Sequence, residues 1–218
     1  MDRAFIFDQI NTWYDWNLYL IAKDIPDPEP DFNFVEIEGM SGTLDLSEAL
    51  AGEITYRDRT ITATFWTDQG TYSERERLLR QIARTLHGKK KKIIEPDDVN
   101  SYLYGRIKIT SIENNLAYAE FSIEAVCEPW RYARFEIERR IEVNGEAAVE
   151  VVINNSGVKT LCPLITVDGS VNITVDGKTT ALASGSCKIA QLKLRQGTNV
   201  VGVSGVGTVV FTYREGDL

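Results

Sequence analysis

Side chains that could carry out catalysis or bind a metal are scarce in this chain. His87 is the single histidine among 218 residues, so it would have to be the base of any Ser-His or Cys-His pair. Cys127, Cys162 and Cys187 stand far apart without a C-x-x-C pair, which predicts free thiols rather than a zinc site or a disulfide framework. We therefore expect no catalytic, cofactor-binding or metal-binding residues, and no enzyme activity.

Two further patterns resemble chemical motifs but lack their context. The stretch "GVSGVG" at 202–207 has glycines at the wrong spacing for a dinucleotide-binding loop, and strand-like residues follow it where a helix is needed. Glu136 and Glu138 are paired carboxylates, but acids that alternate along a strand are typical of a solvated face rather than of acid–base catalysis. Both patterns favour structural roles.

Four consecutive lysines, Lys89 to Lys92, lie in a chain of net charge −8. A nucleic-acid patch would add interleaved aromatics and further cations, whereas "IIEPDD" follows directly. Residues 1–130 contain 14 Lys+Arg against 23 Asp+Glu, a net charge of −9, and residues 131–218 contain 10 against 9, a net charge of +1. An acidic first half argues against binding to a duplex. We predict that the lysines open a solvated strand and deter edge-to-edge pairing.

The segment before the lysines is the one helix that the sequence predicts, over residues 73–88. Its apolar residues recur at helical spacing and form one stripe: Leu78, Leu79, Ile82, Ala83 and Leu86. Ser73 and Glu76 have the spacing of a capping box. His87 falls in the last turn, and Gly88 can adopt the left-handed conformation that ends a helix. The other faces are expected to carry the arginines Arg75, Arg77, Arg80 and Arg84.

The rest of the first half is predicted to consist of strands that alternate between apolar and polar residues. Residues 3–24 are expected to form two strands with a turn near 11–15. The stretches "FVEIEG" and "TITATFW" should be half-buried strands, with an irregular glycine-punctuated segment between them. Residues 101–130 have the clearest hairpin pattern, in which Ile107 and Ile109 alternate with Arg106 and Lys108.

Beyond residue 131 the composition changes to short strands without helical periodicity. The turn signals Asn144-Gly145, Asp168-Gly169 and Asp176-Gly177 recur between them, a pattern typical of a β-sandwich. We predict a mainly-β fold class, with an α+β domain over residues 1–131 that has one main helix, and a sandwich domain over residues 132–218.

Neither a membrane span nor a secretion signal is expected. No stretch approaches the roughly 18–20 uncharged apolar residues that span a bilayer. The first residues lack the basic region, apolar run and cleavage site of a signal peptide. We expect synthesis in the cytosol and no membrane insertion.

Several stretches, in this order along the chain, form a familiar pattern. They are "GMSGTLDLSEAL", "YRDRTITATFW", "SERERLLRQIARTLHGKKKKI", "SYLYGRIKITSI" and "LKLRQGTNVVGVSGVGTVVFTYREGDL". Together they resemble the distal tail protein family of long-tailed bacteriophages and prophages. The resemblance spans nearly the whole chain and lies in the order and spacing of strands and turns rather than in a single motif.

The resemblance implies a structural adapter without cofactors. The first domain would be a belt that closes into a homohexameric ring, and the second a galectin-like β-sandwich. The ring would join the tail-tube protein to the tail-tip or receptor-binding proteins and leave a channel through which DNA passes without sequence-specific contacts. The protein would lie in the tail tip of the virion, be made in the bacterial cytoplasm and be encoded by a prophage.

On this interpretation the lysine run lies on an outer surface or pairs with acids of a neighbouring subunit. The candidate oligomer-interface residues are Arg75, Arg80, Arg84, Lys89, Lys91, Trp13 and Trp16.

Two other functions remain open. A galectin-like sandwich could be a carbohydrate-binding module for host attachment, with Phe135, Phe211 and Tyr213 as the aromatic residues available to stack on a sugar. The chain could also be a tail-tube protein, which would assemble into filaments rather than stop at one ring.

Overall fold

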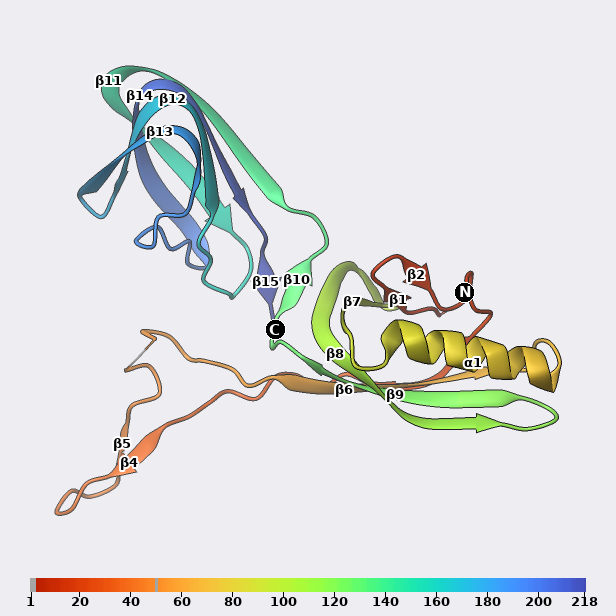
Figure 1. Ribbon diagram of the computed structural model, residues 1–218. Helices are drawn as coiled ribbons and strands as arrows, with labels where there is room; N and C mark the ends of the chain where they lie inside the picture. The colour runs from red at the N-terminus through yellow and green to blue at the C-terminus, as the bar shows by residue number, and fades with distance from the viewer. Residues whose placement is uncertain (1–2, 50) are drawn as a thin grey trace. The chain divides into compact units, whose positions relative to one another are not determined.

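The computed structural model describes residues 3–49 and 51–218, which form two compact units (Figure 1). The first unit contains residues 1–131 with Leu218, and the second contains residues 132–217. Strands predominate in both units, and α1 (Tyr72–Leu86) is the one α-helix of the described residues. The mainly-β fold class predicted from the sequence is therefore confirmed. The first two residues and Leu50, which belongs to the predicted irregular segment, lie outside the described residues.

An antiparallel sheet with the strand order β2-β1-β7-β8-β9-β6-β3 forms the body of the first unit. Its strands are β1 (Ile6–Phe7), β2 (Ile10–Asn11), β3 (Tyr19–Asp24), β6 (Arg59–Thr67), β7 (Lys90–Glu95), β8 (Asp98–Asn114) and β9 (Ala119–Cys127). The hairpin predicted at 101–130 is confirmed as β8 and β9, with Ile107 and Phe121 on its buried side. The N-terminal segment holds three strands rather than two. Asp8 adopts a left-handed φ of 58° and turns the chain from β1 back to β2.

Helix α1 belongs to the core of the first unit through the predicted stripe. Leu79, Ile82 and Leu86 are buried in one cluster with the inward side chains of the sheet. Within residues 3–49 and 51–218 no helix is long and apolar enough to cross a membrane.

The capping box of α1 lies two residues earlier than predicted. Thr71 is the N-cap, its backbone N donates to Glu74 Oε2 at 2.7 Å, and Glu74 N donates to Thr71 Oγ1 at 3.4 Å. The predicted pair, Ser73 and Glu76, lies within the helix, because Tyr72 already belongs to the first turn. Glu76 instead contacts Arg80.

A small two-stranded hairpin interrupts the first unit between β3 and β6. Strands β4 (Phe34–Glu36) and β5 (Thr43–Asp45) pair with each other in their own sheet, at the end of two long connecting segments (Figure 1). The prediction that "FVEIEG" forms a half-buried strand is wrong. All three residues of β4 are exposed, because its one extensive contact among the described elements is with β5. The irregular segment expected after it contains β5.

The second unit is built on one four-stranded antiparallel sheet with the order β11-β14-β12-β13. Its strands are long: β11 (Ile137–Asn155), β12 (Leu164–Val175), β13 (Lys178–Cys187) and β14 (Gly197–Tyr213). The sequence predicts shorter strands that turn at Asn144-Gly145 and Asp168-Gly169. These dipeptides lie inside β11 and β12, and only Asp176-Gly177 makes a hairpin turn. The galectin-like sandwich topology stays a prediction.

Glycines from neighbouring long strands face one another at two positions. Gly169 pairs with Gly207, and Gly145 pairs with Gly205. A Cβ on Gly207 would lie 2.2 Å from Asp168 O, and the φ of Gly207 is 146°. Both the close approach and the backbone conformation require glycine here. The stretch "GVSGVG" thus supplies the glycines at which β14 closely approaches β12, and buried valines lie on both sides of it.

The entry and exit strands of the second unit are joined at their ends. Ile137 at the start of β11 pairs with Tyr213 at the end of β14. Next to this pair, the short strands β10 (Arg131–Ala133) and β15 (Gly216–Asp217) also pair. The guanidinium of Arg214 donates hydrogen bonds of 2.7 Å to the carbonyl oxygens of Ala133 and Arg134. We call this contact the Arg214 clamp.

Candidate functional site

The residues whose side chains could take part in catalysis or metal binding have structural roles. His87 is the C-cap of α1, and its Nδ1 accepts a hydrogen bond from Ile109 N at 3.1 Å. Gly88 follows with a φ of 75°, the predicted left-handed stop. Burial raises the pKa of the Cys127 thiol to about 12, which keeps it protonated at neutral pH. In the described part of the chain no group of three or more His, Cys, Asp or Glu is arranged to hold a metal ion.

The acidic pair at 136 and 138 does not form a two-carboxylate site. Glu136 and Glu138 are both exposed, and Glu136 Oε1 lies 3.1 Å from Arg214 Nη2. Glu136, the residue before β11, is therefore an ion-pair partner of Arg214.

Lys90 to Lys92 form the start of β7, as predicted, and each of these three ammonium groups has a contact within the chain. Lys90 Nζ lies 2.7 Å from Glu128 Oε1, and Lys91 Nζ lies 2.8 Å from Asp8 Oδ2. Lys90 Nζ also lies 4.5 Å from the centre of the Tyr104 ring, and Lys92 Nζ lies 5.0 Å from the centre of the Tyr102 ring. The hydrogen bond to Glu128 raises the pKa of Lys90. Burial alone would raise the pKa of Asp8, but hydrogen bonds from Lys91 and Lys92 lower it. Both acids come from the same chain, so Lys90 and Lys91 need no acid from a neighbouring subunit.

Arg75, predicted on an outer face of the helix and at an interface, is instead 2% exposed. It lies four residues before Leu79 and so faces the sheet with the apolar stripe. Its guanidinium donates to Gly70 O at 2.6 Å, to Asn115 O at 2.7 Å and to Leu116 O at 3.1 Å. Arg75 therefore ties the β8–β9 turn to the start of α1, and it offers no surface to another molecule.

The two candidate tryptophans differ in exposure. Trp16 is 4% exposed and belongs to the core, so its side chain offers no interface surface. Trp13 is partly buried, and its ring centre lies 4.7 Å from that of Tyr19. The contacts continue from Tyr19 to Trp66 and from Trp66 to Tyr118, at 5.5 and 6.4 Å. Trp13 thus ends a row of four aromatic rings that runs across β3 and β6 to Tyr118, the residue before β9.

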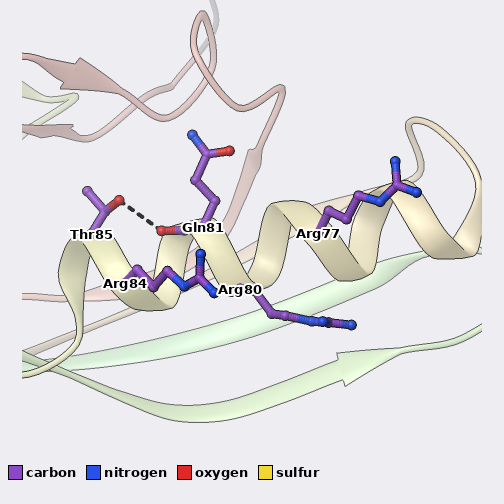
Figure 2. A pocket seen from close by; sticks show the side chains of 5 residues that line it. All are labelled: Arg77, Arg80, Gln81, Arg84 and Thr85. Carbon is purple, nitrogen blue, oxygen red and sulfur yellow. Dashed lines mark hydrogen bonds between the residues drawn. The ribbon is translucent and has the colours of Figure 1, made fainter.

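The arginines on the exposed face of α1 line an open groove of about 410 Å³. Its residues are Arg77, Arg80, Gln81, Arg84 and Thr85, and we call it the arginine groove (Figure 2). Arg80 makes one contact, with Glu76 Oε1 at 3.4 Å, and its side chain is 66% exposed. Among the described residues, no hydrogen bond or ion pair engages the guanidinium of Arg77 or Arg84. Two of the seven candidate interface residues, Arg80 and Arg84, therefore meet in one exposed site.

The candidate set omitted Arg77 and included Arg75. Helical spacing distinguishes them, because 77, 80, 81 and 84 share one face, whereas 75 shares the face of 79 and 82. Lys89 is exposed at the end of the helix, and Lys91 is paired with Asp8.

The acidic excess of the first half is concentrated in one segment. Residues 24–56 contain 9 of the 23 acids and none of the 14 Lys and Arg of residues 1–130. The remaining 14 acids match the 14 cations, so the rest of the unit is balanced. The segment includes the β4–β5 hairpin. The sheet and helix α1 therefore do not carry the net negative charge.

The aromatic residues considered for sugar stacking are largely unavailable. Phe211 is 0% exposed and Tyr213 is 7% exposed. Phe135 is exposed and lies 5.8 Å from the Arg134 guanidinium. An open groove in the second unit is lined by Val175, Asp176, Gln191, Leu192, Lys193, Arg195, Thr198, Asn199, Val200 and Val201. That lining contains no aromatic ring on which a sugar could stack.

Comparison with known proteins finds similarity in structure alone. No protein-family model and no curated protein matches the chain. A solved structure with a similar fold is that of the SPP1 Dit protein (gp 19.1), described as a paradigm of the hub adsorption apparatus in phages that infect Gram-positive bacteria. The TM-score is 0.68 at 14% sequence identity, over 97% of this chain and 98% of that chain. The two proteins thus share a fold from end to end.

Proposed function

We propose that this protein is a structural component of a bacteriophage tail. The observation that carries the proposal is the likeness to the SPP1 Dit protein, which covers nearly all of both chains. A likeness that spans both units is a stronger indication than one shared domain fold, because single domains recur with unrelated functions. At 14% sequence identity the two proteins have the fold in common, and a structural role depends on the fold.

The specific role that we propose is that of a distal tail adapter. Residues 1–131 would form a belt that closes into a homohexameric ring, and residues 132–218 a galectin-like domain on that ring. The ring would connect the tail tube to the tail-tip or receptor-binding proteins and leave a channel for DNA. The protein would be part of the virion, at the tail tip, and encoded by a prophage. A closed ring requires two different patches on each subunit.

Mass measurement of the purified protein with negative-stain imaging tests this role. We expect single rings with six times the mass of the 24.5 kDa chain. Long filaments would instead identify a tail-tube protein. A chain that stays monomeric at every concentration and salt condition would contradict the ring.

A further inference from the structure

The β4–β5 hairpin exposes both acids and apolar side chains. Phe34, Val35 and Leu44 are 56%, 38% and 38% exposed. Glu36 and Glu38 are also exposed, and no ion pair of the described residues engages either carboxylate. An apolar surface of this kind on a two-stranded hairpin is stabilised only when another surface covers it.

The two faces of this hairpin differ in chemistry. Phe34 pairs with Asp45 and Glu36 with Thr43, whereas Val35 pairs with Leu44. Because side chains alternate across a strand, Phe34, Glu36, Asp45 and Thr43 share one face and Val35 and Leu44 share the other. One face is therefore acidic and aromatic, and the other is apolar.

The arginine groove has the complementary charge. Arg77, Arg80 and Arg84 project from the exposed face of α1 (Figure 2), and Glu76 is the acid that contacts one of them. Arginines four residues apart on a helix repeat about every 6 Å. Glu36 ends β4 and Glu38 lies in the turn that follows, so the hairpin presents two exposed carboxylates near its tip to this row of guanidiniums.

We infer that the acidic face of the β4–β5 hairpin docks in the arginine groove of a second copy of this chain. The inference rests on the proposed ring and identifies one of its contacts. Each copy carries one hairpin and one groove, so the contact is head-to-tail and can repeat until the ring closes. Within the described residues no ion pair joins the hairpin to α1 of its own chain. The contact also gives the uncompensated charge of residues 24–56 a partner.

Charge reversal in the full-length protein tests the contact. The groove variant carries Arg80→Glu and Arg84→Glu, and the hairpin variant carries Glu36→Lys and Glu38→Lys. Because like charges then face each other, each variant alone should need at least about a tenfold higher concentration to assemble. A control with Lys178→Glu and Lys188→Glu makes the same charge change as the groove variant, at exposed sites in the second unit, and should assemble as the wild type does.

Mixing the two variants gives the decisive measurement. A lysine hairpin fits a glutamate groove, and the remaining glutamate hairpin fits the arginine groove. An equimolar mixture should therefore assemble with alternating subunits, and added salt should weaken the wild-type contact. Unchanged melting temperatures would show that each variant folds.

The outcomes separate this contact from the ring itself. Wild-type rings with unaffected variants, or variants that the mixture does not rescue, would overturn the hairpin contact and leave the ring standing. A wild type that is monomeric throughout would overturn both.

Discussion

At the level of single residues, helix α1 carries arginines in two environments. Arg75 is buried and donates to backbone carbonyls, whereas Arg77, Arg80 and Arg84 are exposed in a groove. The position of each arginine relative to Leu79 on the helix distinguishes the buried one from the exposed ones, although charge alone suggests that all four are solvated. A long arginine stem can lie along an apolar surface, so spacing is the better guide to its environment.

Truncation of the helix stripe should cost much of the stability. Leu79→Ala or Ile82→Ala removes buried methyl groups from a packed cluster, and we expect each to lower the free energy of unfolding by about 2–5 kcal/mol. Gln81→Ala, on the exposed face, should change it by less than about 0.5 kcal/mol. Urea denaturation measures all three. Equal losses at 79 and 81 would show that the stripe does not pack on the sheet.

Replacement of Lys89 to Lys92 by glutamine should leave DNA binding unchanged. Lys90 and Lys91 are paired within the chain, so we expect no salt-sensitive duplex binding in the wild type. A gel-shift experiment at low salt checks this. Salt-sensitive binding by the wild type that the four glutamines abolish would identify the run as a phosphate-binding patch.

At the level of elements, alternation of residue types located the sheet strands but not their surroundings. Strand β9 fits its prediction because alternate residues from Ala119 to Cys127 are buried, whereas β8 is buried on one side only as far as Ile107 and is exposed from Thr110 to Glu113. The segment at β4 alternates in the same way and is exposed on both sides. Alternation therefore shows that a chain is extended, but a covering partner decides which side is buried.

The two possible capping boxes of α1 can be told apart by mutation. Thr71→Ala should lower the free energy of unfolding by about 1 kcal/mol, because it removes the observed N-cap. Ser73→Ala should have little effect. Hydrogen bonds from Thr71 lower the pKa of Glu74, so their contribution is present above the ordinary carboxyl pKa and fades as pH falls through the lowered value. Thermal melts at pH 7 and pH 3 measure both effects. A larger loss at 73 would favour the sequence-based box.

The close approach of β14 to β12 in the second unit should tolerate no side chain at Gly207. Gly207→Ala places a Cβ 2.2 Å from Asp168 O at a φ of 146°, and we expect a loss of at least about 2 kcal/mol. Gly145→Ala meets nothing within 4 Å and should be nearly neutral. Denaturant midpoints give the comparison. Equal midpoints would mean that the two strands can approach one another without glycine at this position.

At the level of the whole molecule, the fold class could be predicted from the sequence, but long-range contacts could not. The ion pair of Glu95 with Arg131, at 2.5 Å, joins positions 36 residues apart, and no local pattern marks such a pair. Likewise, Asn-Gly and Asp-Gly usually indicate hairpin turns. In β11 and β12 they lie at shifts of register instead, while β14 runs unbroken beside both strands.

The second unit should fold by itself. It has its own buried cluster, which includes Val203, Val209 and Phe211, and a unit of this size can hold an independent core. A fragment of residues 132–218 should show β-type circular dichroism and a cooperative melt. A disordered spectrum would show that the second unit depends on the first.

The Arg214 clamp has a mechanical consequence. The chain enters the second unit through β11 and leaves it through β14, and the two strands begin and end side by side at Ile137 and Tyr213. Tension that draws residues 132 and 217 apart therefore acts across one end of the ladder, where it would unzip the pairs one at a time rather than shear them together. The two hydrogen bonds of Arg214 lie at that end. These two hydrogen bonds must break before the first pair of the ladder, Ile137 with Tyr213, bears the tension.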